Sequence, residues 1–225
     1  MNDDIALLLN SSLYVKRDYL KRRKISIQWG SQRIKQHILG IQALENLKVF
    51  DLFRNVIYTD NTFNNKNKLP NEILEILPSH TIYNLRKNNT YGKKNKGAGL
   101  VENLISCKND IEKFKHIVYF EPKLYLKDVS FFNEFVKDPK NTFFSQEGYL
   151  LYRTGHFGVE SDLLMKFLHL QDLDHLIENQ ITIEYEFYNF FSSYNPHEIS
   201  SSISKRNTGY RYKLDINDIK TYEDY

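Results

Sequence analysis

Alternating or clustered apolar residues mark the strands expected along the chain. Residues 24–29 alternate polar and apolar positions and run into Gly30, a pattern typical of a strand that leads into a loop. Residues 55–59 and 116–120 are runs rich in β-branched and aromatic residues that end at turn-forming or polar residues. Further extended segments are expected at residues 81–85, 149–152 and 181–183.

Helical spacing of apolar residues separates these strands. In residues 34–47 the apolar positions stand three or four residues apart, which gives a helix one apolar stripe that can cover a sheet. Further helices are expected at residues 70–77, 97–105, 131–135, 161–170 and 185–191. Since parallel strands need crossover connections, which helices supply, this alternation predicts an α/β fold with a mostly parallel central sheet flanked by helices.

Length and charge narrow the class of protein. A chain of 225 residues fits a single domain, with residues 200–225 as an extension of it. The net charge of +3 is a weak argument for a polyanionic partner, so nucleic acid is not favoured. Basic residues are interleaved with Tyr91, Tyr210 and Tyr212, so nucleic-acid binding is kept as a lesser alternative. Cys107 is the single cysteine, which excludes an intrachain disulfide framework.

The apolar runs are too short for a membrane protein. Residues 5–9 are apolar but do not reach the length of a signal-peptide core. No stretch approaches the roughly 20 apolar residues that cross a bilayer. We expect a cytoplasmic protein without a transmembrane segment, for which peripheral membrane contact stays open.

Candidate chemistry gathers where the expected strands end. In open parallel sheets ligands bind beyond the carboxyl ends of the strands. Trp29 and Ser31 stand at the first such end, and Asp60 follows the second. The polar loop after the third carries Asn89 and Lys93, and the fourth leads into Glu121 and Lys123. These side chains are expected to line one cleft.

This order of elements resembles the nucleotide-sugar-binding half of GT-A glycosyltransferases. In that family a loop containing Asn and Gly leads into a helix with small residues near its start and a polar residue further along. Residues 88–92 and the run from Gly97 to Asn103 are similar. The resemblance covers residues 24–191 and implies the GT-A (Rossmann-like) architecture. It implies a nucleotide-sugar donor at Trp29, Ser31, Asp60, Asn89, Lys93, Asn103, Glu121 and Lys123.

The acidic motif of the family is altered here. Members often have two aspartates, separated by one residue, that hold a divalent ion on the donor diphosphate; this chain has Glu121 in Phe-Glu-Pro-Lys. A lone Glu supplies at most part of the ligand shell of Mg²⁺ or Mn²⁺. Glu121 could bind the ion with phosphate and water, or Lys93, Lys96 and Lys123 could neutralise the diphosphate directly. Metal-dependent and metal-independent mechanisms are equally expected.

The acceptor side is expected in the second half of the chain. Thr154, Gly155 and His156 resemble the turn that shapes this side in the family. Residues 183–186 stand where inverting members place an acidic residue that deprotonates the acceptor hydroxyl; Glu184 is the better match and Glu186 the reserve. The resemblance implies inverting transfer of a sugar from a nucleotide-sugar donor to a hydroxyl of a glycan or lipid-linked acceptor.

Other enzyme classes lack their motifs. No G-x-G-x-x-G turn follows the first expected strand, and no phosphate-binding G-x-x-x-x-G-K-[ST] sequence occurs. The histidines do not form an H-E-x-x-H set, and there is no G-x-S-x-G elbow. The remaining alternative is a catalytically degenerate GT-A-like module that binds carbohydrate or nucleotide without turnover.

Overall fold

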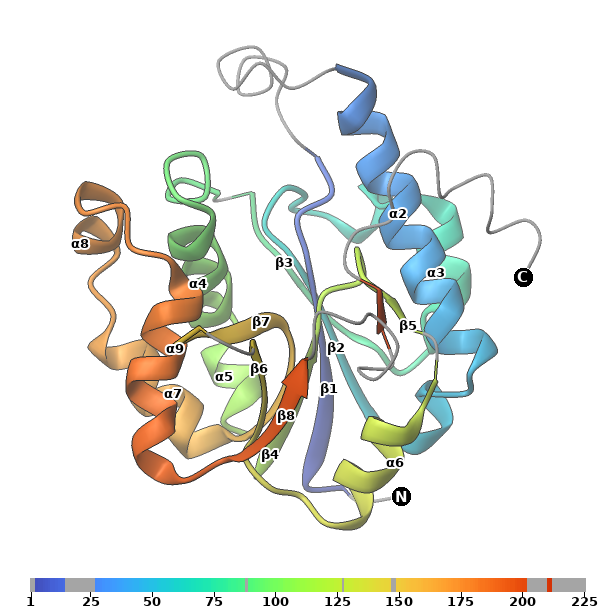
Figure 1. Cartoon of the computed structure of the whole chain (residues 1–225). Helices are drawn as coiled ribbons and strands as arrows, with labels where there is room; N and C mark the ends of the chain where they lie inside the picture. Colours follow the sequence, from blue (N-terminus) through green and yellow to red (C-terminus); the bar gives the residue numbers. More distant parts are fainter. Residues whose placement is uncertain are drawn as a thin grey trace.

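The computed structural model has a seven-stranded sheet with helices on both faces (Figure 1). It describes residues 3–14, 27–87, 89–126, 128–146, 149–201 and 210–211, without the side chains of 27–31, 125, 146, 200–201 and 210–211. The strands, in sheet order, are β3 (Ile82–Leu85), β2 (Asn55–Asp60), β1 (Ile5–Ser11), β4 (His116–Phe120), β7 (Tyr152–Glu160), β6 (Thr142–Gln146) and β8 (His197–Ser201).

Two groups of helices cover the sheet, one on each face. One face carries α4 (Lys96–Ser106), α5 (Lys108–Ile111), α7 (Ser161–Leu170), α8 (Leu173–Glu178) and α9 (Ile183–Phe191). The other carries α2 (Ile27–Asn46), α3 (Asn71–Ile76) and α6 (Ser130–Lys137). The strands β3, β2, β1 and β4 are parallel, and β7 turns the direction, so the predicted α/β fold with its mostly parallel sheet is confirmed.

The central strand β1 is buried on both faces. All of its residues are buried; Ala6 and Leu8 join the core beneath α4, whereas Leu7 and Leu9 join the core beneath α2. A parallel strand covered on both sides needs apolar residues at successive positions, which removes the alternation that marks a half-exposed strand. The sequence prediction placed the first strand at residues 24–29 and was wrong, because α2 already begins at Ile27.

Most other elements match the pattern of apolar positions. The strands expected at residues 55–59, 81–85 and 116–120 are β2, β3 and β4, and the expected helices overlap α2, α3, α4, α6, α7 and α9. The predictions for two extended segments were wrong in part. Of residues 149–152, the first three precede β7, and of residues 181–183, Ile183 already begins α9. Among the described residues, no helix is long and apolar enough to span a membrane.

Two described strands after α9 pair with earlier parts of the chain. Strand β8 extends the sheet by pairing in parallel with β6, beyond the expected core of residues 24–191. A short strand, β9 (Tyr210–Arg211), pairs antiparallel with β5 (Tyr125–Leu126). Residues 202–209 and 212–225 of the expected extension, including Tyr212, lie outside the described part.

His156, which was predicted for the acceptor side, lies in the core. It has no exposed surface, and its ring lies 4.2–5.4 Å, between centroids, from rings of four phenylalanines: Phe120, Phe131, Phe132 and Phe144. The pairing of β6 with β7 shifts register between Phe143 and Phe144, and such a shift changes which residues of a strand face a given core. Burial lowers the pKa of His156 to about 3.

The buried imidazole should make the fold sensitive to acid. Below a pH of about 6.5 the unfolded chain protonates His156 and the folded chain does not, so stability falls as the pH falls. Protonation of His156 in the unfolded chain lowers the free energy of unfolding by about 2 kcal/mol at pH 5 relative to pH 7. His37, whose pKa burial also lowers, acts in the same direction and remains in the variant. In denaturant unfolding, the free energy of unfolding of His156→Met should fall by about 2 kcal/mol less between pH 7 and pH 5 than that of the wild type. An equal fall in both proteins would show that the buried imidazole is not a source of the acid sensitivity.

Gly40 allows α2 to pack on the loop that follows β4. A Cβ atom at Gly40 would lie 1.7 Å from the carbonyl oxygen of Pro122 and 2.7 Å from that of Leu124. These are backbone atoms, so an added methyl group would displace the loop that carries Glu121.

Gly40→Ala should therefore destabilise the protein, although alanine normally favours a helix over glycine by about 0.5–1 kcal/mol. Overpacking of this kind costs about 1–3 kcal/mol. Gln42→Ala, at an exposed position of the same helix, is the control and should stay within about 0.5 kcal/mol of the wild type in the same unfolding measurement. An increase in stability for Gly40→Ala would show that the contact is not as close as described.

Candidate functional site

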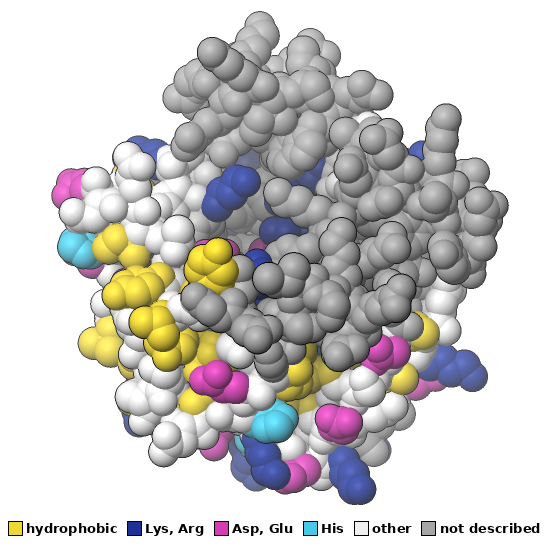
Figure 2. Space-filling model, in the orientation of Figure 1, with side chains coloured by type: hydrophobic (Ala, Val, Ile, Leu, Met, Phe, Trp, Pro, Cys, Tyr) yellow, Lys and Arg dark blue, Asp and Glu magenta, His cyan; other side chains and the backbone are white. Residues whose placement is uncertain are grey.

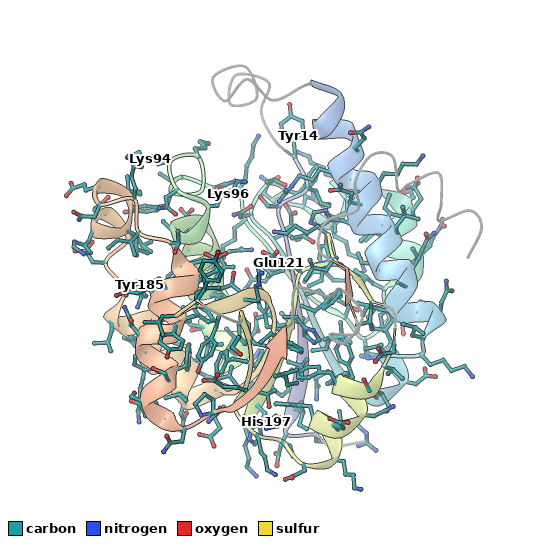
Figure 3. The ribbon with its side chains drawn as sticks, viewed as in Figure 1. Tyr14, Lys94, Lys96, Glu121, Tyr185 and His197 are labelled. Carbon is teal, nitrogen blue, oxygen red and sulfur yellow. The ribbon has the colours of Figure 1, made fainter. Side chains whose placement is uncertain are left out.

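The carboxyl ends of β1, β2, β3 and β4 meet at one edge of the sheet. Figure 2 shows a hollow in the face drawn there, with Lys and Arg side chains at and inside its rim. Figure 3 places Glu121 near the middle of the view, Lys96 above it and Tyr185 to one side. Glu121 directly follows β4, so Figure 3 centres the candidate site on the end of that strand.

Asp60 ties together the loops that follow β1 and β2. Its Oδ2 accepts from the main-chain N–H of Leu13 at 2.9 Å, and its Oδ1 accepts from those of Thr62 and Phe63 at 2.7 and 3.0 Å. Burial raises the pKa of this carboxyl, and the hydrogen bonds oppose the rise. Asp60 was predicted to bind the donor; it is fully buried, and in the structure its carboxyl group shapes the floor of the site.

A chain of buried hydrogen bonds runs beneath the same edge. Thr59 Oγ1 donates to Asn103 Oδ1 at 3.0 Å, and the Asn103 amide donates to Asn10 Oδ1. Asn10 Nδ2 then donates to the Tyr119 hydroxyl at 2.6 Å. Burial raises the pKa of this hydroxyl, and the nearby charge of Glu121 raises it further. Asn103, a predicted donor-binding residue, is only 1% exposed. The chain ends at Tyr119, two residues before Glu121.

Two predicted acidic residues contact consecutive residues of β7. The N–H of Glu121 donates to the carbonyl oxygen of Gly155 at 2.8 Å, and a Cβ at Gly155 would lie 3.7 Å from Glu121 Oε2. The hydroxyl of Thr154 donates to Glu184 Oε1 at 3.4 Å. The structure thus brings Glu121, Thr154, Gly155 and Glu184 together. Glu186 is two residues further along α9, about 200° around the helix from Glu184.

Lys123 places positive charge next to Glu121. Lys123 Nζ forms an ion pair with Glu121 Oε2, and both side chains are largely covered. Arg33 of α2 donates to the carbonyl oxygen of Ser12. The pKa of buried His37 is lowered first by burial and then by the charges of Arg33 and Lys123, so both cations lie near one imidazole. Sequence reasoning missed Arg33, because it placed a strand where α2 begins; its spacing of four residues from His37 was the available signal.

The loop before α4 is held tightly over the sheet edge. Asn95 Oδ1 caps α4 by accepting from the N–H groups of Gly97 and Ala98 at 2.8 and 3.1 Å. A Cβ at Gly99 would lie 2.4 Å from the Cα of Gly92, so the two backbones meet where no side chain fits. This loop therefore has a fixed path across the site.

The predicted residues of this loop face the end of β1. Asn89 Nδ2 lies 3.5 Å from Ser12 Oγ, which joins the loop to the residue after β1. Lys93 is exposed in the loop, and Lys96 begins α4. Trp29 and Ser31 lie on the first turns of α2, and their side chains are outside the described part.

The described side chains do not fit a divalent ion. Within the described ranges no group of three or more His, Cys, Asp and Glu residues could hold a metal. Glu121 is paired with Lys123, and both oxygens of Asp60 accept hydrogen bonds from the loops. Mg²⁺ and Mn²⁺ need several hard oxygen ligands, and these side chains do not supply them.

Comparisons with known proteins agree on the fold. No protein-family model matches the chain, and no curated protein matches its sequence. A Desulfovibrio desulfuricans protein assigned as a nucleotide-diphospho-sugar transferase is 7% identical, with a TM-score of 0.54 over 99% of this chain and 96% of that one. A nucleotidyl transferase from Methanothermobacter is 9% identical, with a TM-score of 0.51 over 91% and 89%.

A cytidylyltransferase from Leptospira borgpetersenii is 14% identical, with a TM-score of 0.55 over 99% of this chain and 84% of that one. At these identities the likeness shows the fold alone. The chain thus has a GT-A-like fold shared with nucleotide-diphospho-sugar transferases and nucleotidyltransferases.

Proposed function

We propose that the chain is a glycosyltransferase that moves a sugar from a nucleotide-sugar donor to a hydroxyl of a glycan acceptor. The observation that supports this most is the approach of Glu121 and Glu184 to the consecutive residues Gly155 and Thr154 at the carboxyl edge of the sheet. Glu184 and the ion pair of Glu121 with Lys123 thus each lie next to one of two consecutive residues of β7. Transfer to a hydroxyl needs both a basic carboxylate and a cationic group for the leaving phosphate.

Glu184 is the proposed general base. The hydroxyl of Thr154 donates to its Oε1, which orients the carboxylate and leaves Oε2 to accept a proton. As the acceptor oxygen bonds to the anomeric carbon of the donor, its proton passes to Glu184. The bond between that carbon and the diphosphate oxygen breaks, and the nucleoside diphosphate leaves. This single displacement inverts the anomeric configuration.

Lys123 is the proposed partner of the departing diphosphate. Glu121 holds its ammonium group at the end of β4, where the resemblance places the donor phosphates. Arg33 lies near the same place and Lys93 stands in the loop before α4. Fixed positive charge at a developing phosphate anion is the main route by which a site without a metal stabilises this leaving group.

Nucleotidyl transfer is the second candidate, because two of the structural neighbours are nucleotidyl- and cytidylyltransferases. A loop whose main-chain N–H groups cradle a triphosphate usually contains glycines. The sequence has no glycine before Gly30, so the loop after β1 lacks this feature. Product analysis separates the candidates: glycosyl transfer releases a nucleoside diphosphate, nucleotidyl transfer releases pyrophosphate, and a degenerate binding module releases neither.

Glu184→Gln should lower turnover by about 10²–10⁴-fold, because the amide cannot take the acceptor proton. Glu186→Gln is the matched control, two residues along the same helix, and should retain nearly normal turnover. Donor affinity and the unfolding midpoint should change little in either variant. Turnover would be measured as nucleoside diphosphate release with acceptor present. Equal activity of Glu184→Gln and wild type would remove Glu184 as the base, and a retained anomeric configuration would exclude the single displacement.

A further inference from the structure

Large apolar side chains stay exposed beside the proposed base. Tyr149 and Leu150, just before β7, are 60% and 66% exposed, and Tyr185 on α9 is 46% exposed. Figure 2 shows hydrophobic side chains gathered on the side of the molecule where Figure 3 labels Tyr185, reaching toward the hollow. Exposed apolar clusters next to a site commonly bind a ligand. We call these three exposed residues, Tyr149, Leu150 and Tyr185, the aromatic rim.

The contacts between β7 and α9 bring Glu184 to the strand that Tyr149 and Leu150 precede. Glu184 bonds to Thr154, and one turn further along α9 the ring of Tyr188 lies 5.1 Å from that of Tyr152. α9 therefore packs along the start of β7. Tyr149 and Leu150 precede that start by three and two residues, and Tyr185 directly follows Glu184.

We propose that the aromatic rim binds a sugar ring of an oligosaccharide acceptor, which rests on the proposed function. The C–H groups on one face of a pyranose pack against an aromatic ring, while its hydroxyls stay at the edge and in water. Tyrosine suits this because it offers a large, rigid, amphipathic surface at a low cost in conformational entropy. A ring held there brings a hydroxyl toward Glu184, which converts an encounter into a positioned reaction.

The charges around the aromatic rim favour a neutral ligand. Tyr185 stands between Glu184 and Glu186 in the first turn of α9. Carboxylates at this position repel the phosphates of anionic lipids and of nucleic acids. A carbohydrate carries no such charge and has both the apolar face and the hydroxyl groups that tyrosine recognises. The rim is thus better matched to a glycan than to a membrane surface.

The test uses the full chain and three variants. Tyr185→Ala and Tyr149→Ala remove the rings of the rim, and Tyr194→Ala is the matched control. Tyr194 is 47% exposed, lies in the 3₁₀ turn that follows α9, and is ten residues beyond Glu184. Each labelled protein is applied to a printed array of oligosaccharides and to phosphatidylglycerol vesicles. Thermal shifts with UDP-, GDP-, CMP- and dTDP-sugars report donor binding separately.

The proposal predicts that the wild type and Tyr194→Ala bind the same glycans and that each rim variant loses about tenfold in affinity, with donor shifts unchanged. Glycan binding that survives in the rim variants, or a wild type that binds a donor but no glycan, would overturn it. Vesicle binding lost in the rim variants without glycan binding would also overturn it, in favour of a membrane contact. If no donor shifts the wild type but glycan binding depends on the rim, the proposed function fails and the carbohydrate site stands.

Discussion

The hydrogen-bond chain from Thr59 through Asn103 and Asn10 to Tyr119 is the interaction on which the sheet edge depends. It crosses β2, α4, β1 and β4 within a core where these side chains are almost completely covered. A buried polar group without a partner costs about 1–3 kcal/mol, so each member holds its neighbour in place. Because β1 is apolar on both faces, the polar groups can appear only where the strand ends, and there they meet Glu121.

From this buried chain the site is built outward. The charge of Glu121 acts on the Tyr119 hydroxyl, Glu121 pairs with Lys123, and the loop after β4 rests on α2 at Gly40. On the other side, β7 returns antiparallel next to β4 and presents Thr154 to Glu184. The site therefore depends on long-range pairing of strands and helices. Its functional groups come from parts of the chain far apart in sequence, which explains why no short motif marks it.

Much of the fold and part of the candidate site could be predicted from the sequence, because the order of apolar segments along the chain indicates the order of strands and helices. The strands β2, β3 and β4 and most helices follow from apolar spacing, and the resemblance selected Glu121, Thr154, Gly155 and Glu184, which the structure brings together. Three features were not predicted from the sequence. β1 lacks alternation because both of its faces are buried, Arg33 was hidden by a strand placed where α2 begins, and His156 is among phenylalanines beside a register shift. Each depends on tertiary packing, which local patterns do not report.

The most direct test of the central claim, a donor site at the carboxyl edge of the sheet, is hydrogen–deuterium exchange with and without nucleotide-sugars. UDP-, GDP-, CMP- and dTDP-sugars would be compared at saturating concentration. The account predicts that one of them slows exchange in residues 12–14, 61–63, 89–95 and 121–124, since a ligand that binds the folded state suppresses local opening. Protection confined to another part of the chain, or no protection by any donor, would contradict it.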